Sequence, residues 1–465
     1  MAGRKQKCRR ISAKVVEDED YQLTYERVAG IDVAKASGVV CVRLPPGPGK
    51  TRRTSRTWEV MAVVPEIEAL AGELTAAGVQ KVSMESTSDY WRVWFVVLEA
   101  AGLAVQLVNS SQARNLPGRP KTDEQDARWI ARLTEMGLLG GSFVPPAQIR
   151  ALRAYTRQLV HLTGDRTRYW QRLEKLLEDA LCKLTAVVSK LAGSVSCREM
   201  IEAMIAGERD PQVLACFARG PMKSKHAALV KAFTGMRFGP QHAFTARSHL
   251  RMIDSLDAEI AALQAQVREH VTQIPAAWGI DGDGSTGPGA GLGDDAAALP
   301  AVQRLAQIPG VSQDIAAGLI AEVGLDMGQF PTPGHLVSWA GMVPVASQSG
   351  PRKSRGKKGQ GNSYARRLAT QAGNGAAGTD TFLGERHARI RQRPGGGGWK
   401  KANCAVGRSI LVIVWHLLSD PAARFTDLGP DHHARHTDTS RKVRGHKRQL
   451  EALGWDVILT PREAA

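Results

Sequence analysis

The chain has 465 residues, a formal net charge of +17 and a pI near 9.8. This length allows two or three domains, and the excess of basic residues favours a nucleic acid over an anionic membrane as partner. We find no apolar run long enough to span a bilayer and, at the basic N-terminus, no signal-peptide stretch. The six cysteines have neither zinc-finger spacing nor a disulfide framework, which fits a reducing cytoplasm.

Residues 1–24 are expected to form a basic disordered arm, and residues 25–145 a first domain. Its predicted order is three strands, then helix, strand, helix, strand and helix, which is that of a ribonuclease-H-like α/β fold. The expected strands are Arg27–Asp32, Gly38–Arg43, Trp58–Val64, Val79–Met84 and Ala104–Val108, and the expected helices are Glu66–Ala77, Tyr90–Ala101 and one that begins after Thr122.

Carboxylates stand at or near the ends of these elements. They are Asp32, Glu85, Asp123 and Asp126. Thr122 is a suitable N-cap with Gln125 as its capping-box partner, so the last two acids fall in one first turn and share a helix face. Hard oxygen ligands of this kind are what Mg²⁺ takes in phosphoryl-transfer sites. A solvated helix start would explain the last pair alone, but four acids in this order favour a divalent-metal nuclease site.

Residues 146–275 are expected to be a helical, coiled-coil-like region. Apolar residues recur at helical spacing from Pro146 to Ala192 and again from Leu250 to Ile274, which predicts an antiparallel helical pair. Packing within one chain and contact between protomers both remain open. The first pattern also carries arginines that either face nucleic acid or are simply solvated: Arg153, Arg157, Arg166, Arg168 and Arg172. Residues 276–298 are too rich in glycine to pack and are expected to be a linker.

Residues 299–420 are expected to form a second, mostly helical domain. Leu305–Gly324 has a helix, Pro-Gly hairpin, helix pattern, which either points backbone amides at a DNA phosphate or is a plain helical hairpin. Ala405–Trp415 is an apolar helix that closes this domain. The polar tail, residues 421–465, contains three histidines whose setting is more typical of a flexible segment than of a metal site: His432, His433 and His436.

From Gly341 to Gly373 there is no acidic residue, while cations crowd around small residues. These cations are expected to bind nucleic-acid phosphates: Arg352, Lys353, Arg355, Lys357, Lys358, Arg366 and Arg367. Ser349 is well placed among them as a nucleophile on phosphorus, because cations stabilise both an ionised hydroxyl and the developing charge. Taken alone, a Ser-Gly beside basic residues is more often a flexible loop, and Ser347 remains an alternative nucleophile.

These motifs resemble the DEDD transposases of bacterial insertion sequences, the IS110 family, whose N-terminal domain is similar to the Holliday-junction resolvase RuvC. The resemblance spans Val28 to about Arg132 and Ala301 to about Leu418. Its motifs are Gly30-Ile-Asp-Val-Ala-Lys35, Met84-Glu-Ser-Thr-Ser-Asp-Tyr-Trp91, Val108-Asn109, Lys121-Thr-Asp, Asp126-Ala, the Gly-x-x-Pro-x-x-x-x-Ser-Gly context of Ser349, and Lys358-Gly-Gln-Gly-Asn362. Lys35 and Asn109 match motif positions, yet they have plainer readings as surface and loop residues.

The resemblance implies that Asp32, Glu85, Asp123 and Asp126 hold Mg²⁺ and that Ser349 forms a covalent phosphoserine intermediate. It further implies donor and target DNA, a bridge RNA from the same element as guide, and a homo-oligomer, dimer or tetramer, in the bacterial cytoplasm. Two rivals remain. One is a resolvase-like endonuclease that uses the carboxylates alone, and the other is a non-catalytic nucleic-acid-binding protein.

Overall fold

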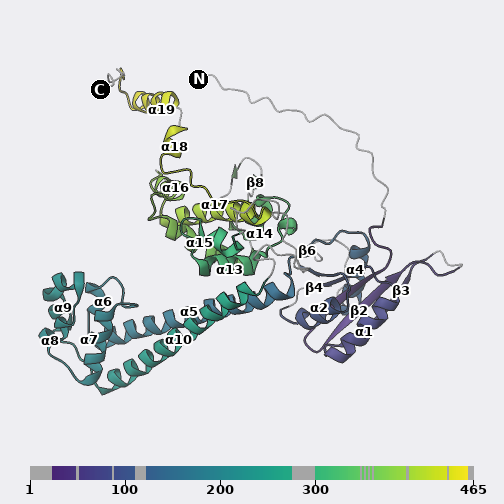
Figure 1. Ribbon diagram of the computed structural model, residues 1–465, viewed down its shortest axis with the longest axis horizontal. Helices are drawn as coiled ribbons and strands as arrows, with labels where there is room; N and C mark the ends of the chain where they lie inside the picture. The colour runs from purple at the N-terminus through teal and green to yellow at the C-terminus, as the bar shows by residue number, and fades with distance from the viewer. Residues whose placement is uncertain are drawn as a thin grey trace. The chain divides into compact units, whose positions relative to one another are not determined.

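The computed structural model comprises two compact units, Met1–Val144 and Pro145–Ala465 (Figure 1). It describes residues 23–48, 52–85, 88–109, 122–274, 299–345, 348–349, 352–353, 357–358, 361–393, 397–436 and 439–458. Almost all of the expected basic arm and the whole of the expected linker therefore lie outside the described residues.

The first unit is built on a six-stranded mixed sheet with the order β3-β2-β1-β4-β5-β6. Its strands are β1 (Val28–Val33), β2 (Ser37–Leu44), β3 (Thr54–Met61), β4 (Lys81–Glu85), β5 (Val105–Val108) and β6 (Gly141–Ser142). The first three strands are antiparallel neighbours, whereas β4 runs parallel to β1 and β5 parallel to β4. This order and these directions are those of a ribonuclease-H-like sheet, as expected.

Two strands differ from expectation for a common reason. The third strand starts at Thr54 and ends at Met61, earlier than Trp58–Val64, and β6 was not expected at all. Both are mostly exposed strands at the edges of the sheet, so few of their residues face the core. An apolar pattern therefore cannot mark where they begin and end.

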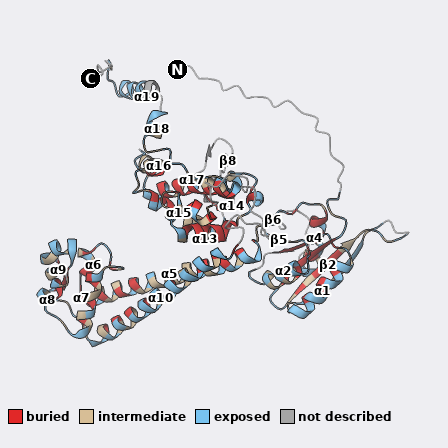
Figure 2. Cartoon of the chain, in the orientation of Figure 1, coloured by how far each residue is buried: buried red, intermediate tan, exposed pale blue. Residues whose placement is uncertain are grey.

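Helices cover both faces of the sheet. They are α1 (Val64–Ala76), α2 (Trp91–Ala100) and α4 (Asp123–Glu135). Because side chains alternate along a strand, Ala29 and Ile31 join one core with α1 and α2, while Val28 joins a second core with Ala127 of α4. The central strands are accordingly the most deeply buried part of this unit (Figure 2).

The second unit begins with a long helical hairpin, α5 (Ala147–Asp179) and α10 (Pro240–Thr272). The two helices are antiparallel, because His270 contacts the carbonyl of Gln148 at 3.2 Å while His242 contacts the Asp179 carboxylate at 3.1 Å. This confirms the expected antiparallel pair. At its closed end, short helices share a core with both long ones (Figure 1): α6 (Leu184–Val187), α7 (Val195–Ala206), α8 (Pro211–Cys216), η1 (Gly220–Lys225) and α9 (His226–Phe233).

The rest of the second unit is mostly helical. Its helices are α12 (Ala301–Ala306), α13 (Gln313–Val323), η2 (Met327–Gln329), α14 (Pro333–Trp339), α15 (Ser363–Ala376), α16 (Phe382–Arg391), α17 (Trp399–Ser419), α18 (His432–Arg435) and α19 (Thr439–Ala452). Close helix packing relies on small residues, since a Cβ at Gly373 would lie 2.5 Å from the carbonyl oxygen of Asn403 in α17. The two tail helices have no fully buried residue among those whose side chains are described, so no apolar pattern predicted them.

Helix α17 corrects one expectation from the sequence. By length and composition it is apolar enough to cross a membrane, although the sequence had indicated no such run. Half of this stretch is buried within the protein, where α17 packs against α12, α14, α15 and α16. A largely apolar helix is also what the centre of a helical domain requires, and this packing identifies α17 as a core helix.

Candidate functional site

The four predicted carboxylates lie toward one edge of the first unit's sheet, namely the edge formed by the carboxyl ends of its central strands β1 and β4. Ile31 pairs with Met84 across the parallel strands β1 and β4, so the next residues, Asp32 and Glu85, are neighbours at the carboxyl ends of those strands. Glu85 is 4% exposed, and Asp32 is half-buried. In open α/β sheets this end of the strands is where ligands usually bind.

The direction of α4 brings its first turn toward the same edge. The carbonyl oxygen of Glu135, the last residue of α4, accepts the N–H groups of Thr24 and Tyr25 at 3.0 and 3.2 Å, just before β1 begins. The C-terminus of α4 thus lies at the start of β1. Its N-terminus, with Asp123 and Asp126, consequently points toward the end of β1 that carries Asp32.

The start of α4 is fixed as the sequence predicted, with one exception. The Thr122 hydroxyl accepts the N–H of Gln125 at 3.4 Å, and its carbonyl oxygen accepts that of Asp126 at 2.9 Å. Asp123 is exposed and Asp126 half-buried. The expected capping box is incomplete, however, because the Gln125 Oε1 atom is buried and has no hydrogen-bond partner in the described structure. Thr122 alone caps the helix.

The chemistry of these four side chains fits a hard divalent cation such as Mg²⁺, which takes oxygen ligands. Their backbones converge on one edge, yet within the described ranges no three Asp, Glu, His or Cys side chains lie close enough to hold an ion. Residues 86–87 and 110–121, next to Glu85 and before α4, are outside the description. The structure therefore brings the four positions to one edge without closing them into a coordination sphere.

In the second unit, Ser349 belongs to a segment whose backbone folds back on itself. Strand β7 (Pro344–Val345) pairs with β10 (Lys357–Lys358), and between them β8 (Gln348–Ser349) pairs with β9 (Arg352–Lys353). Ser349 is the direct backbone partner of Arg352. Four of the predicted phosphate-binding positions thus share these short strands with the serine, while Ser347 and Arg355 lie outside the described residues.

Asn362 stands directly before α15, where it joins the chain that follows the segment to the end of α14. The Asn362 N–H donates to the Trp339 carbonyl oxygen at 3.0 Å, and its Oδ1 accepts the N–H groups of Tyr364 and Ala365 at 2.9 and 3.0 Å. It thereby caps α15. Arg366 and Arg367 follow in the first turns of α15, half-buried and exposed respectively.

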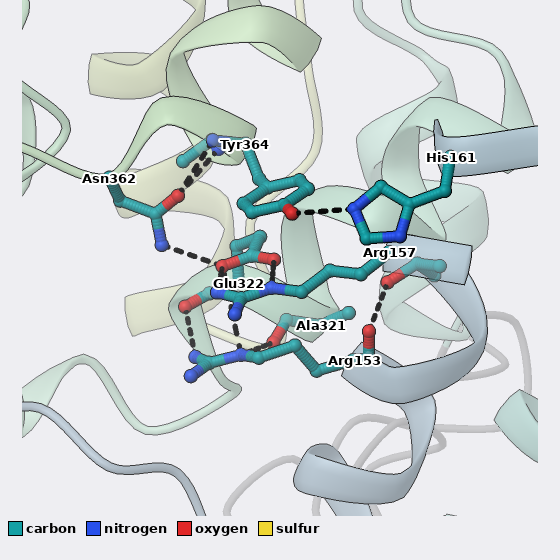
Figure 3. Close-up of polar contacts among 9 residues, drawn as sticks. Arg153, Arg157, His161, Ala321, Glu322, Asn362 and Tyr364 are labelled. Carbon is teal, nitrogen blue, oxygen red and sulfur yellow. Dashed lines mark hydrogen bonds and ion pairs between the residues drawn. The ribbon is translucent and has the colours of Figure 1, made fainter. Parts of the chain in front are cut away.

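The Asn362 side chain also reaches a carboxylate that sequence reasoning missed. Its Nδ2 donates to Glu322 Oε2 at 2.6 Å, and the Arg157 guanidinium binds both Glu322 oxygens, at 2.8 and 2.9 Å (Figure 3). Glu322 is 1% exposed. The Arg157 guanidinium also lies 4.4 Å from the centre of the Tyr364 ring, whose hydroxyl is 3.0 Å from His161 Nε2.

This cluster corrects the sequence-based reading of two arginines on α5. Arg157 binds Glu322, and Arg153 donates to the carbonyl oxygens of Ala321 and Glu322 at 2.8 and 2.7 Å (Figure 3). Both tie α5 to α13, and 15% of the Arg153 side chain and 31% of the Arg157 side chain remain exposed. One signal pointed to Glu322: it is the single charged residue near the C-terminal end of the otherwise apolar helix α13.

The Pro-Gly hairpin between α12 and α13 has a packing role. Gly310 has a φ of +85°, and a Cβ there would lie 2.2 Å from the Ala372 carbonyl oxygen and 2.4 Å from the Ala376 N atom of α15. The neighbouring Ile308 and Val311 are buried. Of the two readings that the sequence left open, this close contact favours the plain helical hairpin.

Two family models match the chain. One, described as a transposase of the DEDD type of IS110 elements, covers residues 29–181, and the other, described as the transposase IS116/IS110/IS902 family, covers residues 302–380. The chain belongs to the IS110 family of transposases. The first match includes all four carboxylates and the second includes Ser349 and Asn362 of this IS110 transposase.

Solved structures of RuvC from Thermus thermophilus also match the IS110 transposase. The protein alone is 16% identical and its complex with a Holliday junction substrate 15%; each match covers 25% of this chain, and 99% and 100% of the RuvC chains, with a TM-score of 0.20. At this TM-score the match does not establish the fold of the first unit. The strand order and strand directions of its sheet do so. No curated protein matches the chain.

Proposed function

We propose that this IS110 transposase cuts and rejoins DNA with two sets of residues, the four carboxylates of the first unit and Ser349 of the second. The observation that carries the proposal is the shared edge of the sheet, to which the register of β1 and β4 and the direction of α4 bring Asp32, Glu85 and the start of α4. Acids from separate elements that converge in this way suit a metal-dependent phosphoryl-transfer site.

The carboxylates would hold Mg²⁺, which polarises the scissile phosphate when bound. The Ser349 oxygen would attack phosphorus, losing its proton, while the bond from phosphorus to the leaving deoxyribose oxygen breaks and that oxygen takes up a proton. The product is a phosphoserine link between protein and DNA. A DNA hydroxyl from the second strand would then attack the phosphoserine and release the serine, so no external energy source is needed.

The basic residues around Ser349 would stabilise the charge that develops on the phosphate oxygens. Arg352 is the nearest in the backbone pairing, and Lys353, Lys357 and Lys358 share the same short strands. Arg355, Arg366 and Arg367 belong to the same basic stretch of sequence. We assign these seven residues to DNA phosphates, and Ser347 remains the alternative nucleophile.

The partners follow from the family resemblance. We propose that the transposase acts in the bacterial cytoplasm on donor and target DNA, that a bridge RNA from its own element guides target choice, and that it works as a homo-oligomer, dimer or tetramer. The charge of +17 suits two nucleic-acid partners.

The decisive experiment incubates the full-length protein with Mg²⁺, DNA from the ends of its element and the flanking transcript. A denaturing gel then separates free DNA from protein-linked DNA. We expect a protein-linked band for the wild type and for Ser347→Ala, but none for Ser349→Ala, Asp32→Asn or a reaction in EDTA. A band lost in Ser347→Ala and kept in Ser349→Ala would move the nucleophile to Ser347.

The same gel separates the two rivals. Free nicks that persist in Ser349→Ala and disappear in Asp32→Asn would support the resolvase-like endonuclease, which needs no serine. Binding of DNA without cleavage under any metal condition would support the non-catalytic protein.

A further inference from the structure

Arginines outnumber acids where α16 meets α17. Arg386 and Arg389 lie one turn apart on α16, Arg393 follows the end of that helix, and Arg408 lies on α17. Burial lowers the pKa of the Arg386 guanidinium, and the positive charges of Arg389, Arg393 and Arg408 lower it further, against a weaker opposite effect of Glu385. Arg389, Arg393 and Arg408 are therefore each close enough to Arg386 to repel its charge.

The cluster lacks the compensation that two other half-buried arginines receive. Arg157 binds both oxygens of Glu322, and Arg198 binds both oxygens of Asp254. In contrast, the Arg386 Nε atom is buried and has no hydrogen-bond partner in the described structure. Glu385, the one acid that offsets the repulsion, accepts a hydrogen bond from Arg389 on Oε1 at 3.1 Å, and its Oε2 atom is buried without a partner in the described structure. An unsatisfied donor beside excess positive charge favours the binding of an anion.

A cavity of about 530 Å³ opens beside these arginines. Arg386 and Arg408 line it, and most of its remaining wall is apolar, including two phenylalanines and aliphatic residues from both helices and the segment 423–428: Phe382, Leu383, Val412, Ile413, Phe425 and Leu428. We call this cavity the α16–α17 groove. Its one carboxylate, Asp427, accepts backbone N–H groups from Phe382 and Gly429 at 3.1 and 3.0 Å and forms no ion pair with an arginine in the described structure.

We propose that the α16–α17 groove binds an unpaired nucleotide of a single-stranded nucleic acid, with a backbone phosphate on Arg386 and Arg408 and the base against the phenylalanines. Guanidinium groups match phosphate oxygens in geometry and charge. Aromatic side chains stack on unpaired bases. The volume lies within the usual range for small-ligand pockets. An apolar peptide would leave the arginines without counter-charge, so charge complementarity favours nucleic acid.

The test measures binding by fluorescence anisotropy, over a salt series, of the full-length protein to labelled oligo-dT, to oligo-U of equal length and to a DNA duplex. Arg408→Gln changes an exposed side chain and should leave folding intact. We expect it to weaken single-strand binding by about tenfold and to reduce the salt slope by about 0.7 for the lost phosphate contact. Arg386→Gln should act in the same direction. Phe425→Ala should weaken single-strand binding more than duplex binding.

Arg56→Gln is the matched control, because it removes one exposed positive charge that is paired with Glu73, far along the chain from the groove. It should leave single-strand binding within twofold of the wild type. A larger loss for oligo-U than for oligo-dT would identify RNA as the source of the nucleotide, and the reverse would identify DNA.

Three results would overturn the proposal: groove variants that bind like Arg56→Gln, an equal loss for duplex and single strand, or tight competition by an acidic peptide. The assay contains EDTA and no Mg²⁺, and it does not depend on Ser349. The binding result can therefore contradict the groove proposal without contradicting the proposed strand transfer, and the reverse also holds.

Discussion

Gly30 shows how a single residue sets the distance between a helix and the sheet. A Cβ at this position would lie 2.4 Å from the Ala131 N atom and 2.6 Å from the Ala127 carbonyl oxygen of α4. We expect Gly30→Ala to push α4 away from β1 and to lower the free energy of unfolding by about 1–3 kcal/mol, because the added methyl group overpacks the contact. Because α4 carries Asp123 and Asp126, metal-dependent cleavage should fall with it. Thermal unfolding and the cleavage gel measure both effects.

Gly72→Ala provides the control for this prediction. Gly72 lies on the exposed side of α1, and a Cβ there would meet no atom within 4 Å. Alanine in a helix interior should stabilise the unit by about 0.5–1 kcal/mol and leave cleavage unchanged. Equal behaviour of the two variants would show that α4 does not depend on the close approach at Gly30.

At the residue scale, the sequence predicted what depends on local pattern and motif. The N-cap at Thr122 follows from residue type and from the helix that it precedes, and the structure confirms it. Glu322 was missed because its partners Arg157 and Asn362 are distant in sequence. A buried carboxylate is stable only with such partners, and these are visible only once the chain is folded. The roles of the four carboxylates and of Ser349 stay predictions.

At the scale of elements, Asn362 links the start of α15 to α13 and, through Glu322, to α5. Asn362→Ser should keep the cap on α15, because serine is also a good N-cap, but should lose the hydrogen bond to Glu322. We therefore expect faster hydrogen exchange in the segment 340–362 and slower formation of the protein–DNA link, with DNA binding little changed. Mass-spectrometric exchange and the denaturing gel provide these readings.

Glu322→Gln tests the same link from the other side. It leaves Arg157 without its counter-charge and should lower the free energy of unfolding by about 3 kcal/mol. This value is at the lower end for a broken buried ion pair, because 31% of the Arg157 side chain is exposed to water. Glu135→Gln is the matched control: this carboxylate, 3% exposed, pairs with Arg43 and Arg53 in the first unit. If Glu135→Gln also accelerates exchange in the segment 340–362, the effect is general loosening and not positioning by Glu322.

The elements themselves were predicted where apolar periodicity is strong. The buried strands β1, β4 and β5 and the helices α1 and α2 lie within a few residues of expectation, because their core-facing residues recur at a fixed period. Helix α5 begins as expected but ends at Asp179, well before Ala192. Helix α10 begins at Pro240, before the expected Leu250, since its first turns carry few large apolar residues. The exposed edge strands and the tail helices lack a buried face, and no pattern marks them.

At the scale of the whole molecule, each unit has a hydrophobic core of its own. We expect two thermal unfolding transitions, one for each unit, because chains with more than one domain depart from a single two-state transition. Gly30→Ala should lower only the transition of the first unit. Leu173→Ala removes a fully buried side chain of α5 and should lower only the other, at a cost of about 2–5 kcal/mol. Scanning calorimetry of the full-length variants measures both. A single transition that moves with either substitution would mean that the two units unfold as one.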